Sequence, residues 1–227
     1  MNNPEGEENM NKKTMKHALA MLLCSASAFA PFCATADEWA DANGNIWSYT
    51  AGADSITISG CSFATNVVTV PDEIGGKQVR TIAENAFKGN KTIKELTVPD
   101  SITSLGQGVF SGCTALESIT IGNGITTLPE VKYNGRNKLG SGFDGYVDWM
   151  YDTGISELYY KAIFYNCTSL KTVNLGRNLQ TIGNLAFLDC KSLKEVTLPE
   201  SVNKIGCHAF YRCSSLLKVT VLELHCA

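Results

Sequence analysis

The sequence predicts a β-rich solenoid, an array of about five 23-residue units in which short strands alternate with turns or short helices. One motif position always holds phenylalanine, and its neighbouring members are 23 residues apart, except for 54 residues between Phe110 and Phe164. Because a unit of this length cannot bury its own apolar side chains, successive units must stack on one another. We expect these phenylalanines to form one column inside the array: Phe87, Phe110, Phe164, Phe187 and Phe210.

Apolar residues alternate with polar ones in each unit, as at Val196 and Leu198, which flank Thr197. This period of two is typical of a strand with one buried face. The intervening residues are mostly threonine, which suits the exposed face of a sheet. We therefore expect a parallel sheet along one side of the array, with these outward positions: Thr97, Thr120, Asn174, Thr197 and Thr220.

The N-terminus has the pattern of a secretory signal peptide. A basic segment, Asn11–His17, precedes an apolar segment, Ala18–Ala30, and an A-x-A cleavage signature ends at Ala36. We expect cleavage after Ala36, with Met10 and Met15 as alternative starts of translation. Export makes the mature chain a secreted or cell-surface protein in a compartment that permits disulfides.

The remaining chain divides into a cap and the repeats. Residues 37–70 are expected to form an N-terminal β cap, because Trp47–Val70 alternates and is broken by Gly and Asn turns. Repeats fill residues 71–227. The long third unit carries 31 extra residues, which we place as an insertion at about 130–161. The final residues depart from the repeat, so we expect a truncated C-terminal end.

Composition narrows the function classes. The chain is 44% hydrophobic and 18% charged, with a net charge of −3. Nucleic-acid-binding proteins normally carry a basic patch, so this charge argues against a nucleic-acid partner. No apolar run reaches the roughly 18 residues that span a bilayer, so we expect no transmembrane segment in the mature chain. We also expect no cofactor and no metal.

The insertion is rich in aromatic residues and glycine. Tyrosine and tryptophan combine apolar area with a hydrogen-bonding tip, which suits interface anchors. Insertions in a repeat array often lie on its binding face. The alternative is a loop that packs on itself and covers the repeat beneath. The candidate ligand-binding residues are Tyr133, Phe143, Tyr146, Trp149, Tyr151 and Tyr159.

The strand face is the second candidate surface. Its polar residues offer hydroxyl, amide and carboxylate groups, although a merely solvated sheet would show the same composition. The candidate residues on this face are Glu95, Thr97, Thr120, Asn174 and Thr197.

Most cysteines belong to the repeat. The position three residues after each column phenylalanine holds Asn90 in the first unit and cysteine in the next four. Both residue types have short side chains that can form hydrogen bonds with the backbone of a tight turn. Side chains in a ladder point the same way, which disfavours disulfides. Cys207 and His208 fall at non-core positions of the repeat, so we interpret them as surface residues. The sequence leaves open whether Cys61, Cys207 and Cys226 are free or bridged; a bridge between Cys207 and Cys226 is one alternative. The four cysteines of the ladder are Cys113, Cys167, Cys190 and Cys213.

The motif I-G-x-x-A-F-x-x-C-x-S-L-K-x-V-x-L-P, carried by Ile182–Pro199, resembles the BspA-type leucine-rich repeat. The resemblance covers about Val67–Val221 and implies a leucine-rich repeat array. Such proteins are typically exported or surface-displayed and bind host proteins, matrix or other microbes. No catalytic residue comes with the family.

Three functions therefore remain open. The first is a non-enzymatic adhesion or binding protein, with a host or microbial surface protein or glycan as its partner. The second is a structural spacer within a larger surface protein. The third is an extracellular hydrolase that uses the insertion, for which His17, His208 and His225 offer no evident catalytic set.

Overall fold

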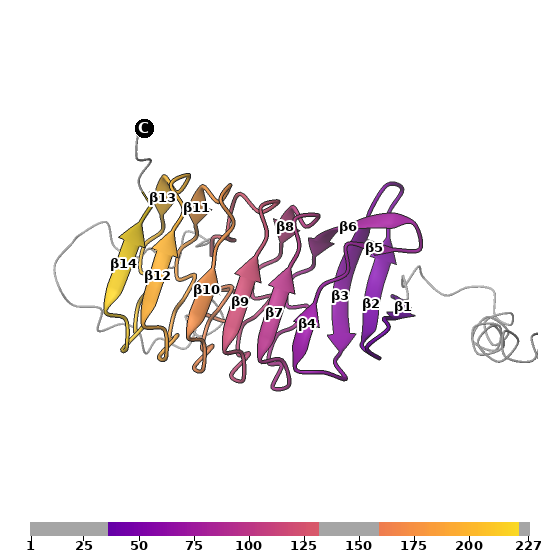
Figure 1. The fold of residues 1–227 in the computed structure, drawn as a ribbon, viewed down its shortest axis with the longest axis horizontal. Helices are drawn as coiled ribbons and strands as arrows, with labels where there is room; N and C mark the ends of the chain where they lie inside the picture. Colours follow the sequence, from indigo (N-terminus) through magenta and orange to yellow (C-terminus); the bar gives the residue numbers. More distant parts are fainter. Residues whose placement is uncertain (1–35, 132–158, 223–227) are drawn as a thin grey trace, which may run out of the picture. The chain divides into compact units, whose positions relative to one another are not determined.

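The computed structural model describes residues 36–131 and 159–222, and they form the predicted β-rich solenoid (Figure 1). Within these residues, turns rather than short helices connect nearly all the strands. The strands of the array lie side by side in sequence order, in two rows.

The first row forms the predicted strand face. Four strands pair in parallel in the order β10-β9-β7-β4, and β12 pairs in parallel with β14. Equivalent repeat positions face one another, because Leu96 lies opposite Ile119, and Ile119 opposite Val173. The strands are β4 (Val67–Thr69), β7 (Glu95–Val98), β9 (Ser118–Ile121), β10 (Thr172–Asn174), β12 (Glu195–Leu198) and β14 (Lys218–Val221).

The second row contains shorter strands. In it, β6 pairs in parallel with β8, and β11 with β13, while a single bridge joins Thr127 to Thr181. A Cβ atom on Gly183 would overlap the carbonyl of Pro129, so the Ile-Gly step of the repeat lets neighbouring units approach closely. The strands are β6 (Lys77–Ile82), β8 (Ser104–Leu105), β11 (Thr181–Ile182) and β13 (Lys204–Ile205).

An antiparallel ribbon precedes the array. β1 (Asp37–Ala40) pairs with β2 (Ile46–Ala51), which pairs with β3 (Ile56–Ser62); β3 then joins β6 in parallel. The short β5 (Glu73–Ile74) pairs antiparallel with β6. The rings of Trp47 and Phe63 pack edge-on against Phe87, at centroid distances of 6.1 and 5.4 Å. That this ribbon is required as a cap stays a prediction.

The predicted phenylalanine column is confirmed. Ring centroids of successive members lie 5.0 to 5.9 Å apart, and the planes of the last three rings are nearly parallel. Phe110 stacks on Phe164, and β9 pairs with β10, although the insertion separates them in sequence. The insertion therefore leaves the array and returns to it without interrupting the stack.

The cysteine ladder is confirmed as a buried feature of the repeat. Each thiol donates to the carbonyl of the column phenylalanine one unit earlier, at 3.0 to 3.2 Å. Asn90 at the head of the ladder differs, because its side chain accepts from the backbone of Thr92 and Ile93 in its own turn. The thiols thus tie each unit to its predecessor, and all four are unbridged.

Candidate functional site

The structure places all five candidate residues of the strand face on solvent-exposed positions of β7, β9, β10 and β12. Parallel register sets Thr97 opposite Thr120, and Thr120 opposite Asn174. The Asn174 amide donates to the Thr120 hydroxyl at 3.2 Å. These side chains therefore share one outward face, with Thr97, Thr120 and Asn174 in a row of paired strands. That they bind a ligand stays a prediction.

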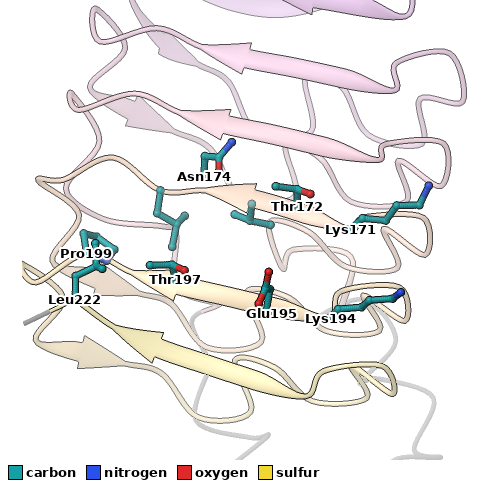
Figure 2. A pocket seen from close by; sticks show the side chains of 10 residues that line it. Lys171, Thr172, Asn174, Lys194, Glu195, Thr197, Pro199 and Leu222 are labelled. Carbon is teal, nitrogen blue, oxygen red and sulfur yellow. The ribbon is translucent and has the colours of Figure 1, made fainter.

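This face is hollowed where the ladder of strands is interrupted. Hydrogen bonds join β9 to β10 and β12 to β14, but β10 and β12 belong to separate sheets. Between them lies a groove of about 540 Å³ (Figure 2). The repeat pattern in the sequence did not predict this groove, because β10 and β12 carry the same pattern.

Proline follows two strands of this row, β7 and β12. At the end of the neighbouring strands, Gly122 donates its N–H to Val98 at 2.8 Å, and Leu222 donates to Leu198 at 3.0 Å. The equivalent residue after β12 is Pro199, which has no N–H to donate. One backbone bond between β12 and β10 is therefore missing at this end. Pro99 removes the same donor after β7, which still pairs with β4, so the proline alone does not account for the interruption.

The groove has a polar end and an apolar end (Figure 2). Lys171, Lys194 and Glu195 gather at one end, whereas Pro199 and Leu222 stand at the other. The exposed side chains of Thr172 and Thr197 line the walls between them. A groove of this kind offers charge, hydroxyl groups and apolar contact to an elongated ligand.

Ion pairs fix one side of the polar end. The Glu117 carboxylate pairs with Lys171 at 2.6 Å and with Lys94 at 3.7 Å. The hydrogen bond from Lys171, and then its charge, lower the pKa of Glu117 below its usual value. Lys194 makes no ion pair with any residue that the structure describes. The Lys194 ammonium group is thus a cation in the groove that has no ion-pair partner among the described residues.

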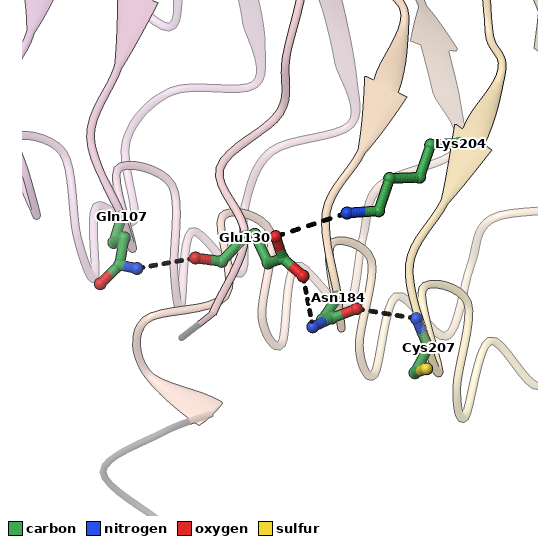
Figure 3. A network of polar contacts seen from close by, with 5 residues as sticks. All are labelled: Gln107, Glu130, Asn184, Lys204 and Cys207. Carbon is green, nitrogen blue, oxygen red and sulfur yellow. Dashed lines mark hydrogen bonds and ion pairs between the residues drawn. The ribbon is translucent and has the colours of Figure 1, made fainter. Parts of the chain in front are cut away.

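The insertion begins at a polar network (Figure 3). The Glu130 carboxylate accepts from the Asn184 amide at 2.9 Å and lies 3.6 Å from the Lys204 ammonium. Gln107 donates to the Glu130 carbonyl at 2.7 Å, and the Cys207 N–H donates to Asn184 at 2.8 Å. Three units of the array therefore hold the first residues of the insertion in place.

Both ends of the insertion meet in a small hydrophobic cluster, which we call the root cluster. Val131 precedes the undescribed segment and Tyr159 follows it, and both pack here. The complete set is Val131, Ala162, Leu185 and Leu188, with Tyr159, Tyr165 and Tyr211 partly buried against it. The two ends thus leave from and return to one place on the array.

Tyrosines form the outer layer of the root cluster. Tyr160 is exposed and packs edge-on against Tyr165 at 5.4 Å, and the Lys88 ammonium lies 4.8 Å from the Tyr160 ring centre. Burial raises the pKa of Tyr159 and Tyr165. Sequence analysis missed Tyr165 and Tyr211, which follow the column residues Phe164 and Phe210 and so signal one shared surface position.

Of the six insertion candidates, Tyr159 alone falls within the described residues, where it is half-buried in the root cluster. The other five lie outside the described residues: Tyr133, Phe143, Tyr146, Trp149 and Tyr151.

The stretch Cys207–Cys213, with the sequence CHAFYRC, contains both buried and exposed residues, as its repeat positions predict. Cys213 is buried and donates to Phe187, whereas Cys207 and His208 are exposed. Within 36–131 and 159–222, no group of three or more His, Cys, Asp or Glu side chains is arranged to hold a metal ion. Cys207 and Cys61 are unbridged, while Cys226 lies outside the described residues.

The stacked 23-residue units, the phenylalanine column and the parallel strand rows define a leucine-rich repeat solenoid. The sequence model for the BspA type leucine rich repeat region matches residues 45–141 and 156–225, in six copies. The chain belongs to this family. The match begins at residue 45, so it includes β2 and β3 of the N-terminal ribbon.

Solved structures of bacterial leucine-rich repeat proteins share the fold. The T. pallidum protein TpLRR is 22% identical over 85% of this chain and 82% of its own, with a TM-score of 0.55. A leucine-rich repeat protein from Bacteroides ovatus is 24% identical, with a TM-score of 0.56; the match covers 86% of this chain but 41% of that protein. A search of curated proteins found no significant match. No helix in the described part of the chain is long and apolar enough to span a membrane.

Proposed function

We propose that this chain is an exported or cell-surface, non-enzymatic binding protein that holds a protein or glycan ligand on its strand face. The observation that carries the proposal is the groove between β10 and β12, which interrupts an otherwise regular polar sheet. The scaffold supports it, because the side chains that stack the units are buried and leave the outward positions free to vary. The signal-peptide pattern supports export.

The groove suits an elongated ligand better than a compact one. Its walls carry hydroxyl groups, and one end presents the Lys194 ammonium, which has no ion pair among the described residues. An extended peptide or an oligosaccharide presents acceptors for these groups at regular intervals. A carboxylate on the ligand would meet Lys194.

Matched arginine substitutions test the groove. The variant Thr172→Arg/Thr197→Arg fills it, whereas Thr97→Arg/Thr120→Arg places the same side chains on β7 and β9, away from it. We expect the wild type to bind a member of a panel of glycans and extracellular-matrix proteins. The groove variant should lose at least about tenfold in affinity, and the control should keep it. Equal affinity of both variants would overturn the proposal.

The insertion is the second proposed contact element. Its support is the convergence of its two ends on one tyrosine-rich cluster, beside the exposed Tyr160. Replacing residues 132–158 by a short Gly-Ser linker should leave the array folded, because Val131 and Tyr159 already share one cluster. Binding that is unchanged in this variant, with an intact circular dichroism spectrum, would remove the insertion from the ligand site.

A structural spacer is the alternative function. The uncovered apolar face of the last unit favours it, since such a face stacks naturally on further repeats. A wild-type chain that binds no member of the panel would favour the spacer.

A further inference from the structure

Among the described residues, nothing packs on the outer side of the last unit of the array. Val219 and Val221 of β14 are 43% and 55% exposed, whereas the equivalent Val196 and Leu198 of β12 are each 1% exposed. In the second row, Ile205 is 49% exposed. The apolar positions that normally pack against the next unit therefore face solvent.

Backbone groups are also unpaired at both ends of the described array. β13 and β14 each pair on one side only, with β11 and β12. At the other end, β1 pairs only with β2 among the described strands. A free strand edge is a template for pairing with another chain.

The two ends carry opposite charge. Residues 204–222 include three basic side chains and no acidic one. Lys204 and Arg212 pair with Glu130 and Asp189, so Lys218 is the cation of this end without an ion pair to a described residue. Residues 36–76 include no lysine or arginine and six acidic side chains: Asp37, Glu38, Asp41, Asp54, Asp72 and Glu73. Asp37 and Glu38 stand on the free strand β1 itself, and both are exposed.

The acidic end also offers apolar contact. Ile46, which lies opposite Ala40 in the β1–β2 ribbon, is 41% exposed. An end-to-end contact would bring Ile46 and Ala40 toward the uncovered side chains of the last unit. Contact between two C-terminal ends would instead oppose like charges, which is destabilising.

We propose that a second copy of this chain covers the last unit, head to tail, through its acidic β1–β2 edge. Lys218 of one copy faces Asp37 and Glu38 of the next, and β1 approaches the free edge of the last unit. Because this contact uses two different surfaces, each copy keeps one end free, and copies add into chains rather than closing into a dimer.

Charge-reversal variants of the full chain test the proposal. By sedimentation velocity at low ionic strength, we expect the wild type to form species larger than the dimer as its concentration rises. Added salt should weaken this association, because the Debye length falls from about 10 Å at 0.1 M to about 3 Å at 1 M. Lys218→Glu and Asp37→Lys/Glu38→Lys should each stay monomeric, since each retains one mismatched end.

Mixing the two variants provides the decisive measurement. The reversed C-terminal end of Lys218→Glu is then complementary to the reversed N-terminal end of Asp37→Lys/Glu38→Lys. We expect the mixture to associate although neither variant does so alone. Lys91→Glu, an exposed change away from both ends and without an ion pair to a described residue, should associate as the wild type does. A monomeric wild type, or association that persists in both single-end variants, would overturn the proposal.

Discussion

At the scale of single residues, the buried cysteines show how one side chain serves the stacking. Each ladder thiol is buried and bonded to a carbonyl of the preceding unit. Burial raises the pKa of Cys113, Cys167 and Cys213, that of Cys213 to about 11. The ladder was predictable because the residue type recurs at one position, but its bonding partners follow only from the distance between neighbouring units.

Alkylation should distinguish the two kinds of cysteine. The thiolate is the reactive form, and a buried thiol with a raised pKa supplies little of it. At pH 8, iodoacetamide should modify the exposed Cys207 first and leave the four ladder cysteines unmodified until urea unfolds the chain. Mass spectrometry of tryptic peptides checks the order. Native-state labelling of Cys167 at the rate of Cys207 would show that the ladder is not buried.

Stability should decline at alkaline pH for the same reason. Burial raises the folded-state pKa of Cys113, Cys167 and Cys213 above the ordinary value of 9.0, so folding favours the neutral form of these thiols. Their contribution is therefore complete below pH 9 and is lost as the pH rises toward the folded-state values. Urea denaturation at pH 8 and pH 10 should show a lower midpoint at pH 10, with a smaller decrease in Cys167→Ala.

Backbone conformation provides a second prediction at this scale. The residue two positions after each column phenylalanine has positive φ; it is glycine at Gly89 and Gly112 but Arg212, with φ of 59°, in the last unit. Arginine carries a cost of about 1–2 kcal/mol in this conformation, and glycine does not. Sequence comparison of the units did not reveal this shared conformation, because arginine and glycine have no side-chain property in common.

Arg212→Gly should therefore be more stable than Arg212→Ala by about 1 kcal/mol, since both remove the side chain and only alanine keeps the strain. The midpoint of urea unfolding measures the difference. Lys191, an exposed turn residue without positive φ, is the control. There the order should reverse, with alanine the more stable; the same order at both positions would contradict the argument.

At the scale of elements, the strands and the phenylalanine column were predictable because period-two alternation and a 23-residue spacing are visible in the sequence. The groove between β10 and β12 was not predictable from these columns. The β12 unit keeps the apolar pattern of its neighbours, and the proline that follows it, Pro199, has a counterpart in Pro99 after β7, which still pairs with β4. The tyrosines of the root cluster were missed because they contact one another only after the insertion returns to the array.

The position of a phenylalanine in the column should decide its contribution. Phe164 is fully buried and stacks between two rings, so Phe164→Ala should cost about 3–5 kcal/mol of unfolding free energy. Phe210 stacks on one ring only and is partly exposed, so Phe210→Ala should cost less. Chemical denaturation of both variants measures the difference. Equal costs would show that the open end of the column is as well packed as its middle.

At the scale of the whole molecule, most of the sequence specifies scaffold. Each unit contacts mainly its neighbours, so stability is approximately a sum of unit and interface contributions. This explains why the family and fold were evident from the sequence while the ligand was not. The stacking positions repeat and are recognisable, whereas some outward positions differ between units. The position of Glu195 in the groove, for example, holds Glu95, Ser118, Thr172, Glu195 and Lys218 in successive units.

The same organisation predicts a gradient of local stability along the array. β13 and β14 lie beside one neighbour only and carry exposed apolar side chains, so they should open with a lower free energy than β7, β9 and β10. Hydrogen exchange of a dilute sample should therefore be fastest in residues 204–222 and slowest in the central strands. Uniform protection would mean that the array unfolds as one unit. Repeating the measurement at high concentration separates the two ideas: head-to-tail contact should slow exchange in β14 and β1 together, whereas the intrinsic gradient of a single chain should leave both unchanged.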